Sequence, residues 1–173
     1  MLTNAMRRNH ARGWLFLLGC LLAAVAQAAE PVASVRVAVA GQPPVSFDRA
    51  ALAAMPQATI TAAAHEEAQS QWQGVALDEL LRRAGAPLDK PLRGHNLARF
   101  VRVTATDHYQ VVFSLGELDA TLGHAKVILA SQRDGKPLAA DGPFRLVVAG
   151  DERPARWVRN VVSIDVIDGA IAP

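Results

Sequence analysis

The chain has 173 residues, of which 51% are hydrophobic and 20% charged, and its formal net charge is +2. This balance excludes the strongly basic surface that nucleic-acid-binding proteins and proteins of anionic membrane surfaces usually need. Without such a surface, any site for an anion must be local. The length predicts one domain of ordinary size, which can bury about 70% of the surface that its unfolded chain would expose.

Residues 1–28 have the features of a secretory signal peptide. Three arginines precede an apolar run over residues 14–25, and the small-residue cleavage site Ala26-Gln27-Ala28 follows it. The run is shorter than the roughly 20 residues that span a bilayer, which favours a cleaved signal over a transmembrane helix. We expect residues 29–173 to form a single mature domain in the periplasm; a lipoprotein anchor at Cys20 is the less favoured alternative.

Loss of this segment would change both the charge and the available chemistry. The segment contains three of the 18 basic residues and no acidic residue, so the mature chain has 15 basic and 16 acidic residues and a net charge of −1. It also contains Cys20, the only cysteine. A chain without cysteine forms no disulfide, no thiolate metal site and no cysteine nucleophile.

In the first half of the mature chain, short stretches of alternating and helical periodicity follow one another. The expected elements are a strand over 35–40, a helix from Asp48 through Met55, a strand over 59–63, a helix that Asp78 caps and Gly85 ends, and a loop over 87–96. The second helix places its apolar residues on one face: Leu77, Leu80, Leu81 and Ala84.

Strand patterns dominate the second half. The expected elements are strands over 99–105 and 109–113 joined by a turn at Asp107, a short helix from the capping box Ser114–Glu117, a strand over 126–132, a hairpin turn at Asp134-Gly135, and strands over 144–149 and 161–167. Short strands and helices without a regular strand–helix–strand rhythm predict an α+β domain with a mixed sheet.

The segment after residue 149 combines a proline with two arginines. Pro154 could open a short helical turn, because its φ is preset and it has no N–H to lose. The free N–H groups of residues 155–157 would then point one way, with Arg153 and Arg156 on the same face. This predicts an oxyanion site, most naturally for a phosphate, with solvated loop arginines as the alternative. Trp157 is expected to pack inward and help orient Arg156.

Three ordered motifs carry a resemblance to a known family. They are the W-x-G segment Trp72–Leu81, the triplet Asp107-His108-Tyr109, and a C-terminal segment with Gly135-Lys136-Pro137-Leu138, Gly142–Val148, Arg153 and Arg156-Trp157. On these motifs, residues 35–168 resemble the molybdopterin-binding domain of the sulfite oxidase family. The resemblance implies that family's fold and a pocket for a pterin or molybdopterin. His108 stands where the family usually has glycine.

The resemblance also implies a metal ligand that this chain lacks. In the enzymes of the family a cysteine thiolate binds molybdenum and precedes the tryptophan motif, whereas residues 59–65 here are TITAAAH. The fold and the pterin pocket carry over as expectations, and molybdenum is in doubt. The histidines match no zinc spacing, and His65-Glu66-Glu67 is expected to be a solvated turn rather than a metal site.

Five further residues are candidate contacts to the pterin. Trp72 either lies in the core or covers a flat pocket, and Gly74 would let a planar ligand approach the backbone. Tyr109 could pack on the sheet while its hydroxyl reaches the ligand. A carboxylate at Asp107 would suit the 2-amino and N3–H edge of a pterin, although aspartate more often stabilises its own turn. His95 lies in a polar loop and could hydrogen-bond a ligand.

Two functional hypotheses follow. The first is a periplasmic module that binds a pterin or molybdopterin without catalysis and reports its occupancy to a membrane signalling partner. The second is a molybdopterin-dependent oxidoreductase, or a subunit of one, that holds molybdenum without a cysteine. Arg7-Arg8 lacks the neighbours of a twin-arginine signal for folded, cofactor-loaded export, which favours the first hypothesis. A decayed pocket in an interaction scaffold is a third possibility.

Overall fold

A computed structural model of the protein describes residues 33–64, 67–139 and 141–170. The strands of the first sheet are β1 (Ser34–Val39), β2 (Val45–Asp48), β5 (Phe100–Ala105), β6 (Gln110–Ser114) and β10 (Val161–Ile167). Those of the second are β3 (Gln57–Ala62), β4 (Ser70–Ala76), β7 (Val127–Arg133), β8 (Lys136–Pro137) and β9 (Arg145–Val148). The helices are α1 (Arg49–Ala53), α2 (Leu77–Arg83), α3 (Leu115–Leu118) and the 3₁₀ turns η1 (Gly94–Ala98) and η2 (Pro154–Arg156).

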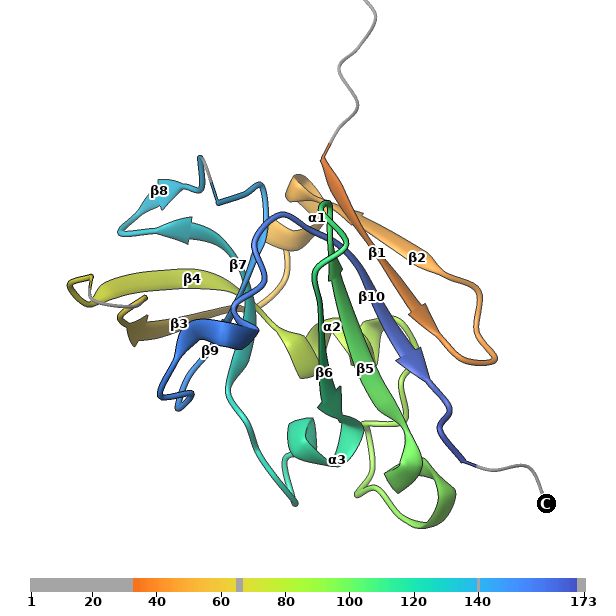
Figure 1. Cartoon of the computed structure of the whole chain (residues 1–173). Coiled ribbons are helices and arrows are strands. Elements are labelled where there is room, and N and C mark those ends of the chain that lie inside the picture. Colours follow the sequence, from red (N-terminus) through yellow and green to blue (C-terminus); the bar gives the residue numbers. More distant parts are fainter. Residues whose placement is uncertain (1–32, 65–66, 140, 171–173) are drawn as a thin grey trace, which may run out of the picture. The chain divides into compact units, whose positions relative to one another are not determined.

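The two sheets differ in strand direction (Figure 1). The first has the order β2-β1-β10-β5-β6, in which β1 and β10 are parallel and the other neighbours antiparallel. The second has the order β3-β4-β7-β8 and is antiparallel, with β9 also paired to β7. The predicted α+β class is confirmed, but the strands form two sheets instead of one.

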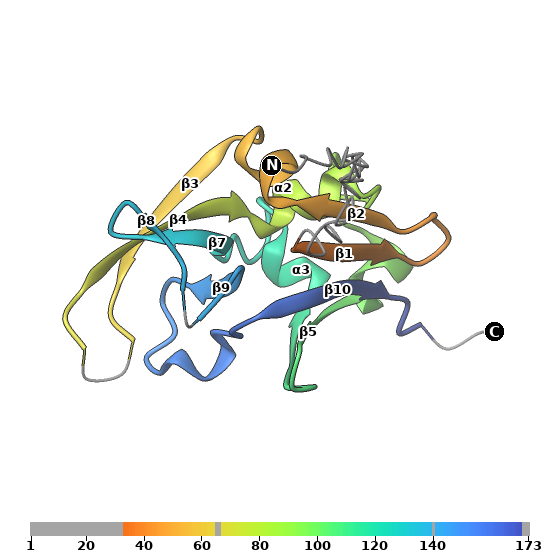
Figure 2. The ribbon, with the colours of Figure 1, turned by 90° about the horizontal axis from the view of Figure 1, so that it is seen from above.

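The buried apolar side chains form one cluster to which both sheets contribute. Strands β1 and β5 alternate between buried and exposed or half-buried residues, as expected for strands with one face on the core. Helix α2 adds Leu77, Leu80 and Leu81, all fully buried. Figure 2 shows α2 and α3 near the middle of the molecule, close to strands of both sheets. Helix α3 follows β6, whereas the candidate site extends from the β5–β6 turn at the other end of that strand.

Local signals in the sequence predicted several element boundaries correctly. The carboxylate of Asp48 accepts a hydrogen bond from the Ala51 N–H at 2.7 Å and caps α1. The hydroxyl of Ser114 accepts one from the Glu117 N–H at 2.9 Å and caps α3. The hairpin residues Asp134 and Gly135 both have positive φ, 51° and 74°, as a type I′ turn requires.

One predicted helix cap was wrong, and two strands were missed. Asp78 does not cap α2: the capping position is Ala76, which makes no side-chain hydrogen bond, and Asp78 lies in the first turn, where it pairs with Arg82. Strands β2 and β4 were not expected, because their sequences alternate only partly.

No helix within the described residues is long and apolar enough to cross a membrane.

Candidate functional site

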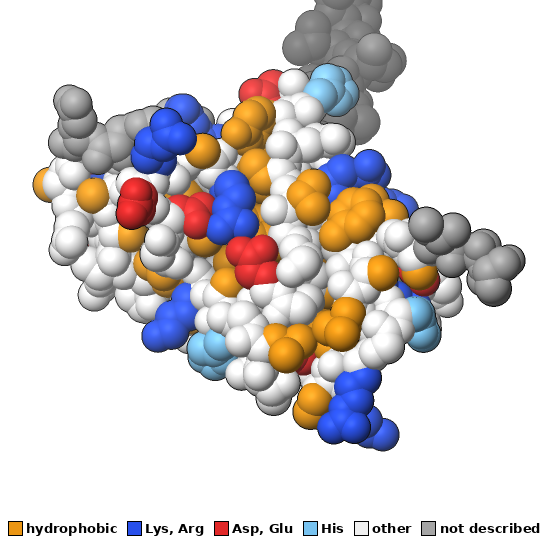
Figure 3. Space-filling model, turned by 60° about the horizontal axis from the view of Figure 1, so that its bottom comes forward, with side chains coloured by type: hydrophobic (Ala, Val, Ile, Leu, Met, Phe, Trp, Pro, Cys, Tyr) orange, Lys and Arg blue, Asp and Glu red, His pale blue; other side chains and the backbone are white. Residues whose placement is uncertain are grey.

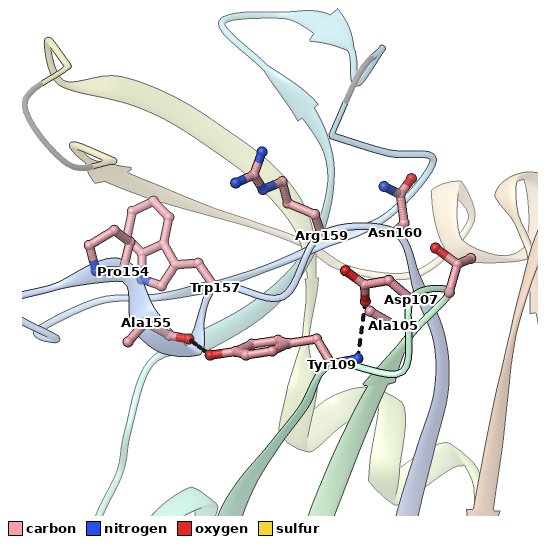
Figure 4. Close-up of a pocket in the computed structure, with 9 residues that line it drawn as sticks. Ala105, Asp107, Tyr109, Pro154, Ala155, Trp157, Arg159 and Asn160 are labelled. Atoms are coloured by element: carbon pink, nitrogen blue, oxygen red, sulfur yellow. Dashed lines mark hydrogen bonds between the residues drawn. The ribbon is translucent and has the colours of Figure 1, made fainter.

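A pocket of about 560 Å³ lies where the β5–β6 turn (residues 106–109) meets the η2–β10 segment (residues 154–160), as Figure 4 shows. Its lining is Ala105, Thr106, Asp107, Tyr109, Pro154, Ala155, Trp157, Arg159 and Asn160. The Tyr109 hydroxyl donates a hydrogen bond to the Ala155 carbonyl at 2.7 Å, and the Thr106 N–H donates one to the Asn160 carbonyl at 3.1 Å. These two bonds hold the walls of the pocket together.

The β5–β6 turn presents a carboxylate and an aromatic ring to the pocket. Asp107 Oδ1 accepts a hydrogen bond from the Tyr109 N–H at 3.0 Å, which fixes the orientation of the carboxylate. His108, at the position where the family usually has glycine, has a φ of 68°, so the turn keeps a backbone conformation that glycine adopts easily. Asp107 therefore stabilises its own turn and also lines the pocket, and Tyr109 remains 49% exposed there.

The opposite wall contains two polar residues that the sequence did not single out, Arg159 and Asn160. The Arg159 side chain is 63% exposed, and its guanidinium lies 3.5 Å from the Asp141 carboxylate. Trp157 packs inward as predicted: it is 5% exposed, and its indole N–H donates to the Val148 carbonyl at 3.1 Å. Sequence spacing does not indicate that Arg159 and Asn160 belong to a site, because they line the pocket only where folding brings the β5–β6 turn opposite them.

Arg156 is not part of the pocket lining. Its guanidinium donates to the Asp151 carboxylate at 2.6 and 2.9 Å and to the Glu117 carboxylate at 2.9 Å, and it lies 4.5 Å from the centre of the Phe113 ring. These contacts raise the pKa of Arg156 above its ordinary value, chiefly through the hydrogen bonds to Asp151. Two carboxylates thus already neutralise the guanidinium that was predicted to bind a phosphate.

The backbone around η2 also differs from the expectation. Pro154 does open a short helical turn, but the Trp157 N–H donates to the Pro154 carbonyl at 3.1 Å. The prediction that the N–H groups of residues 155–157 are all free is therefore wrong for Trp157. Arg153 is exposed and does not line the pocket.

Trp72 and Gly74 lie within the protein core and the second sheet. Trp72 is fully buried, and its indole N–H donates to the Ala62 carbonyl at 3.2 Å. A Cβ atom on Gly74 would lie 2.0 Å from the Leu129 carbonyl oxygen of β7. The close approach of the two strands thus accounts for the glycine, and the approach of a planar ligand there stays a prediction. Of the two readings of Trp72, the structure supports the core residue.

The remaining predicted residues lie elsewhere. His95 is exposed on η1 and does not line the pocket. His65 and Glu66 lie outside the described residues. Among the residues that the structure does describe, no group of three or more histidine, cysteine or acidic side chains could hold a metal ion.

Arg145 of β9, which belongs to the Gly142–Val148 motif but was not among the predicted site residues, is buried beside Trp157 of the pocket lining. The Arg145 guanidinium lies 4.9 Å from the centre of the Trp72 ring and 5.7 Å from that of Trp157, and the two indoles meet edge to face at 5.8 Å. Arg145 is paired with Asp141, the carboxylate that also lies near Arg159. Burial lowers the pKa of Arg145. The Asp141 carboxylate is therefore an ion-pair partner of two guanidinium groups, that of the buried Arg145 and that of Arg159 in the pocket lining.

Comparison with known proteins agrees with this architecture. The crystal structure of the sulfane dehydrogenase SoxCD from Paracoccus pantotrophus matches with a TM-score of 0.61 and 22% identity, over 80% of this chain and 39% of that chain. This likeness shows the fold alone, and the chain spans only about two fifths of that protein. No curated protein sequence matches the chain significantly. The profile of the family described as oxidoreductase molybdopterin binding domain matches residues 25–171. The chain belongs to this oxidoreductase molybdopterin-binding domain family.

Proposed function

We propose that the domain binds a pterin in the pocket between the β5–β6 turn and the η2–β10 segment, and that it acts as a binding protein rather than a molybdenum enzyme. The observation that supports this most is the composition of the pocket wall. One carboxylate (Asp107), one guanidinium (Arg159), one amide (Asn160) and the ring of Tyr109 surround a volume of about 560 Å³.

This set of groups fits the hydrogen-bonding edges of a pterin. The 2-amino and N3–H groups of the ligand are donors, and the Asp107 carboxylate is an acceptor that the Tyr109 N–H already orients. The O4 and N5 atoms are acceptors, and Arg159 and Asn160 offer donors from the opposite wall. A charge-assisted hydrogen bond contributes roughly 1.5–3 kcal/mol, and stacking on an aromatic ring about 0.5–1.5 kcal/mol. Both kinds of contact favour a bound pterin, and the entropy cost of association opposes them.

The residues that the structure describes before the tryptophan motif do not fit a protein-ligated molybdenum. The only cysteine of the chain, Cys20, is far from the tryptophan motif in sequence, and the segment before that motif contains Ala62, Ala63 and Ala64, whose methyl groups bind no metal. Family membership keeps molybdopterin itself among the candidate ligands. The second candidate function, a subunit of a molybdopterin-dependent oxidoreductase, is supported by that membership and would require the metal to be held by the pterin dithiolene or by another protein ligand.

We propose further that the domain acts in the periplasm. The basic and apolar segment over residues 1–28 supports export to the periplasm. A domain that binds a small molecule there without a redox centre would serve as a carrier or as a sensor module that reports to a membrane partner.

Asp107→Asn is expected to weaken the binding of 6-hydroxymethylpterin by about tenfold or more, because a charge-assisted hydrogen bond becomes a neutral one. Asparagine keeps an oxygen for the Tyr109 N–H, so the turn should remain intact. Titration of the purified protein, followed by pterin fluorescence and checked by equilibrium dialysis, measures the dissociation constant.

Asp89→Asn is the matched control. It removes the same charge from a side chain that is 74% exposed, lies outside the pocket and has one long ion pair with Arg82 at 3.5 Å. Its affinity for the pterin should equal that of the wild type. Equal weakening in both variants, or none in Asp107→Asn, would show that the pterin does not contact this carboxylate.

A further inference from the structure

Strand β3 is the longest of the strands that lie at a sheet edge. It has six residues, whereas β2, β6, β8 and β9 have four, five, two and four. Figure 2 shows β3 on the outside of the second sheet, next to β4. Within the part of the chain that the structure describes, no main-chain hydrogen bond joins β3 to a segment other than β4. One side of its backbone is therefore open to another strand.

The other edge strands have features that hinder pairing with a further chain. Strand β8 is Lys136-Pro137, β2 ends at Asp48 and continues directly into α1, and β9 is fully buried. Beside β6, the Tyr109 hydroxyl is hydrogen-bonded to Ala155 of η2. The sequence of β3, QATITA, contains no charged residue and no proline. Its edge is thus a template for pairing with another chain.

A small pocket of about 150 Å³ adjoins this strand. Its lining includes Ala58, Thr59 and Ile60. Because successive residues of a strand point to opposite faces, a pocket that contacts all three reaches the edge of the strand. The remaining lining is mostly apolar and includes Leu118 and Val127. A cavity of this volume holds one apolar group of about the size of benzene, so it could take one side chain of an added strand.

The pocket lining also offers a positive charge that has no partner in the described part of the chain. Lys126 lines the pocket, is exposed and forms no ion pair there. The Asp78 carboxylate, which also lines the pocket, lies 3.1 Å from the Arg82 guanidinium, which balances it. On the face shown in Figure 3, basic and acidic side chains are interspersed, so that face has no extended charged surface to attract a partner. Attraction of an acidic partner to Lys126 is therefore local.

We propose that β3 is a docking edge for an extended, acidic segment of a protein partner. The segment adds a strand beside β3 and places one apolar side chain in the pocket, as in other cases of strand addition. A carboxylate two positions further along lies on the same face of the segment and pairs with Lys126. A second copy of the chain would present β3, which has no carboxylate. The docking edge shares no residue with the pterin pocket, so the proposal does not depend on pterin binding.

The probe is the capped peptide acetyl-Thr-Leu-Thr-Glu-Thr-Val-amide, added to the isotope-labelled protein and followed by the backbone amide signals in NMR spectra. We expect saturable shifts that are largest at residues 57–62 and 124–128, and no shifts at residues 106–109 of the pterin pocket. No saturable shift at residues 57–62 would overturn the proposal and leave the pterin site standing.

Two N-methylated versions of the peptide test the strand pairing itself. The N–H groups of alternate residues point to opposite edges of a strand, so each version blocks one edge of the peptide. The version blocked on the edge that faces β3 should lose binding, and the other should keep it. Equal binding by both versions would show an apolar contact without strand pairing, which would overturn the proposal.

Charge reversal tests the chemistry of the partner. At low salt the wild type should bind the peptide about threefold or more tightly than its analogue with Lys in place of Glu, and Lys126→Glu should invert this preference. Lys136→Glu is the matched control, because it reverses the same charge on an exposed side chain of β8, outside the pocket. The control should keep the wild-type preference. Equal changes in both variants would contradict a local role of Lys126 and overturn the proposal.

Sedimentation without the peptide tests the other occupant, a second copy of the chain. Thr59→Lys places a charge on the exposed face of β3 and should leave the sedimentation coefficient unchanged. A dimer that this substitution dissociates would assign the edge to a second copy and overturn the proposal.

Discussion

Gly74→Ala is expected to yield little folded protein. The added Cβ atom would lie 2.0 Å from the Leu129 carbonyl oxygen and 2.6 Å from the Ala130 Cα atom, and both belong to the backbone of β7, where no side chain can move aside. Strands β4 and β7 are inner neighbours in the second sheet, so their separation would disturb the whole sheet. We expect a loss of more than about 4 kcal/mol in the free energy of unfolding, a large part of the 5–15 kcal/mol typical of a domain.

Thermal unfolding and the yield of soluble protein measure this effect. Gly116→Ala is the control, because a Cβ there would meet only the Leu122 and Leu97 side chains at 3.6 and 3.7 Å, an ordinary contact. It also lies in α3, where alanine is favoured over glycine by roughly 1 kcal/mol. If Gly74→Ala unfolded like the wild type, the register of β4 against β7, which shifts between Gln73 and Gly74, would have to be different.

The second large effect is expected for Arg156→Ala, and it concerns stability. The substitution leaves the carboxylates of Asp151 and Glu117 facing each other without the guanidinium and removes its contact with the Phe113 ring. Because the Arg156 side chain is 32% exposed, water screens part of the cost. We expect a loss of roughly 1–3 kcal/mol in the free energy of unfolding, measured by urea denaturation.

Arg153→Ala serves as the control, since that side chain is exposed and should leave stability unchanged within about 0.5 kcal/mol. A phosphate-binding Arg156, as its spacing predicts, would give the opposite pattern: pterin affinity would fall by more than tenfold and the thermal midpoint would stay the same. Titration of the folded variant at low temperature separates the two outcomes.

The local features of this fold were predictable from sequence because short-range rules determine them. The caps at Asp48 and Ser114, the Asp134-Gly135 turn and the alternating strands depend on neighbours within a few residues. The sequence did not predict β4, because its polar residues, among them the buried Ser70, interrupt the apolar pattern expected of a strand that lies between two others. Only the pairing with both neighbours makes it recognisable.

The candidate site was predictable in part for the same reason. Asp107 and Tyr109 belong to one short motif and do line the pocket. The ion pairing of Arg156 depends on Glu117, which is 39 residues away in the chain. Arg159 becomes a pocket residue because the β5–β6 turn, about 50 residues earlier in the chain, lies opposite it. Charge spacing alone cannot show that two carboxylates bind the guanidinium of Arg156, or that Arg159 lines the pocket. It therefore selected Arg156 and not Arg159.

We expect the pocket to bind a pterin without a protein-ligated molybdenum. The ligand and metal content of the purified, unreconstituted protein tests this: fluorescence of the acid-released, oxidised ligand together with molybdenum by mass spectrometry. The purified protein should release pterin in near-equimolar amount, with molybdenum far below it. Molybdenum equimolar with the chain would mean that the domain holds the metal, and would require a metal ligand in place of the missing thiolate.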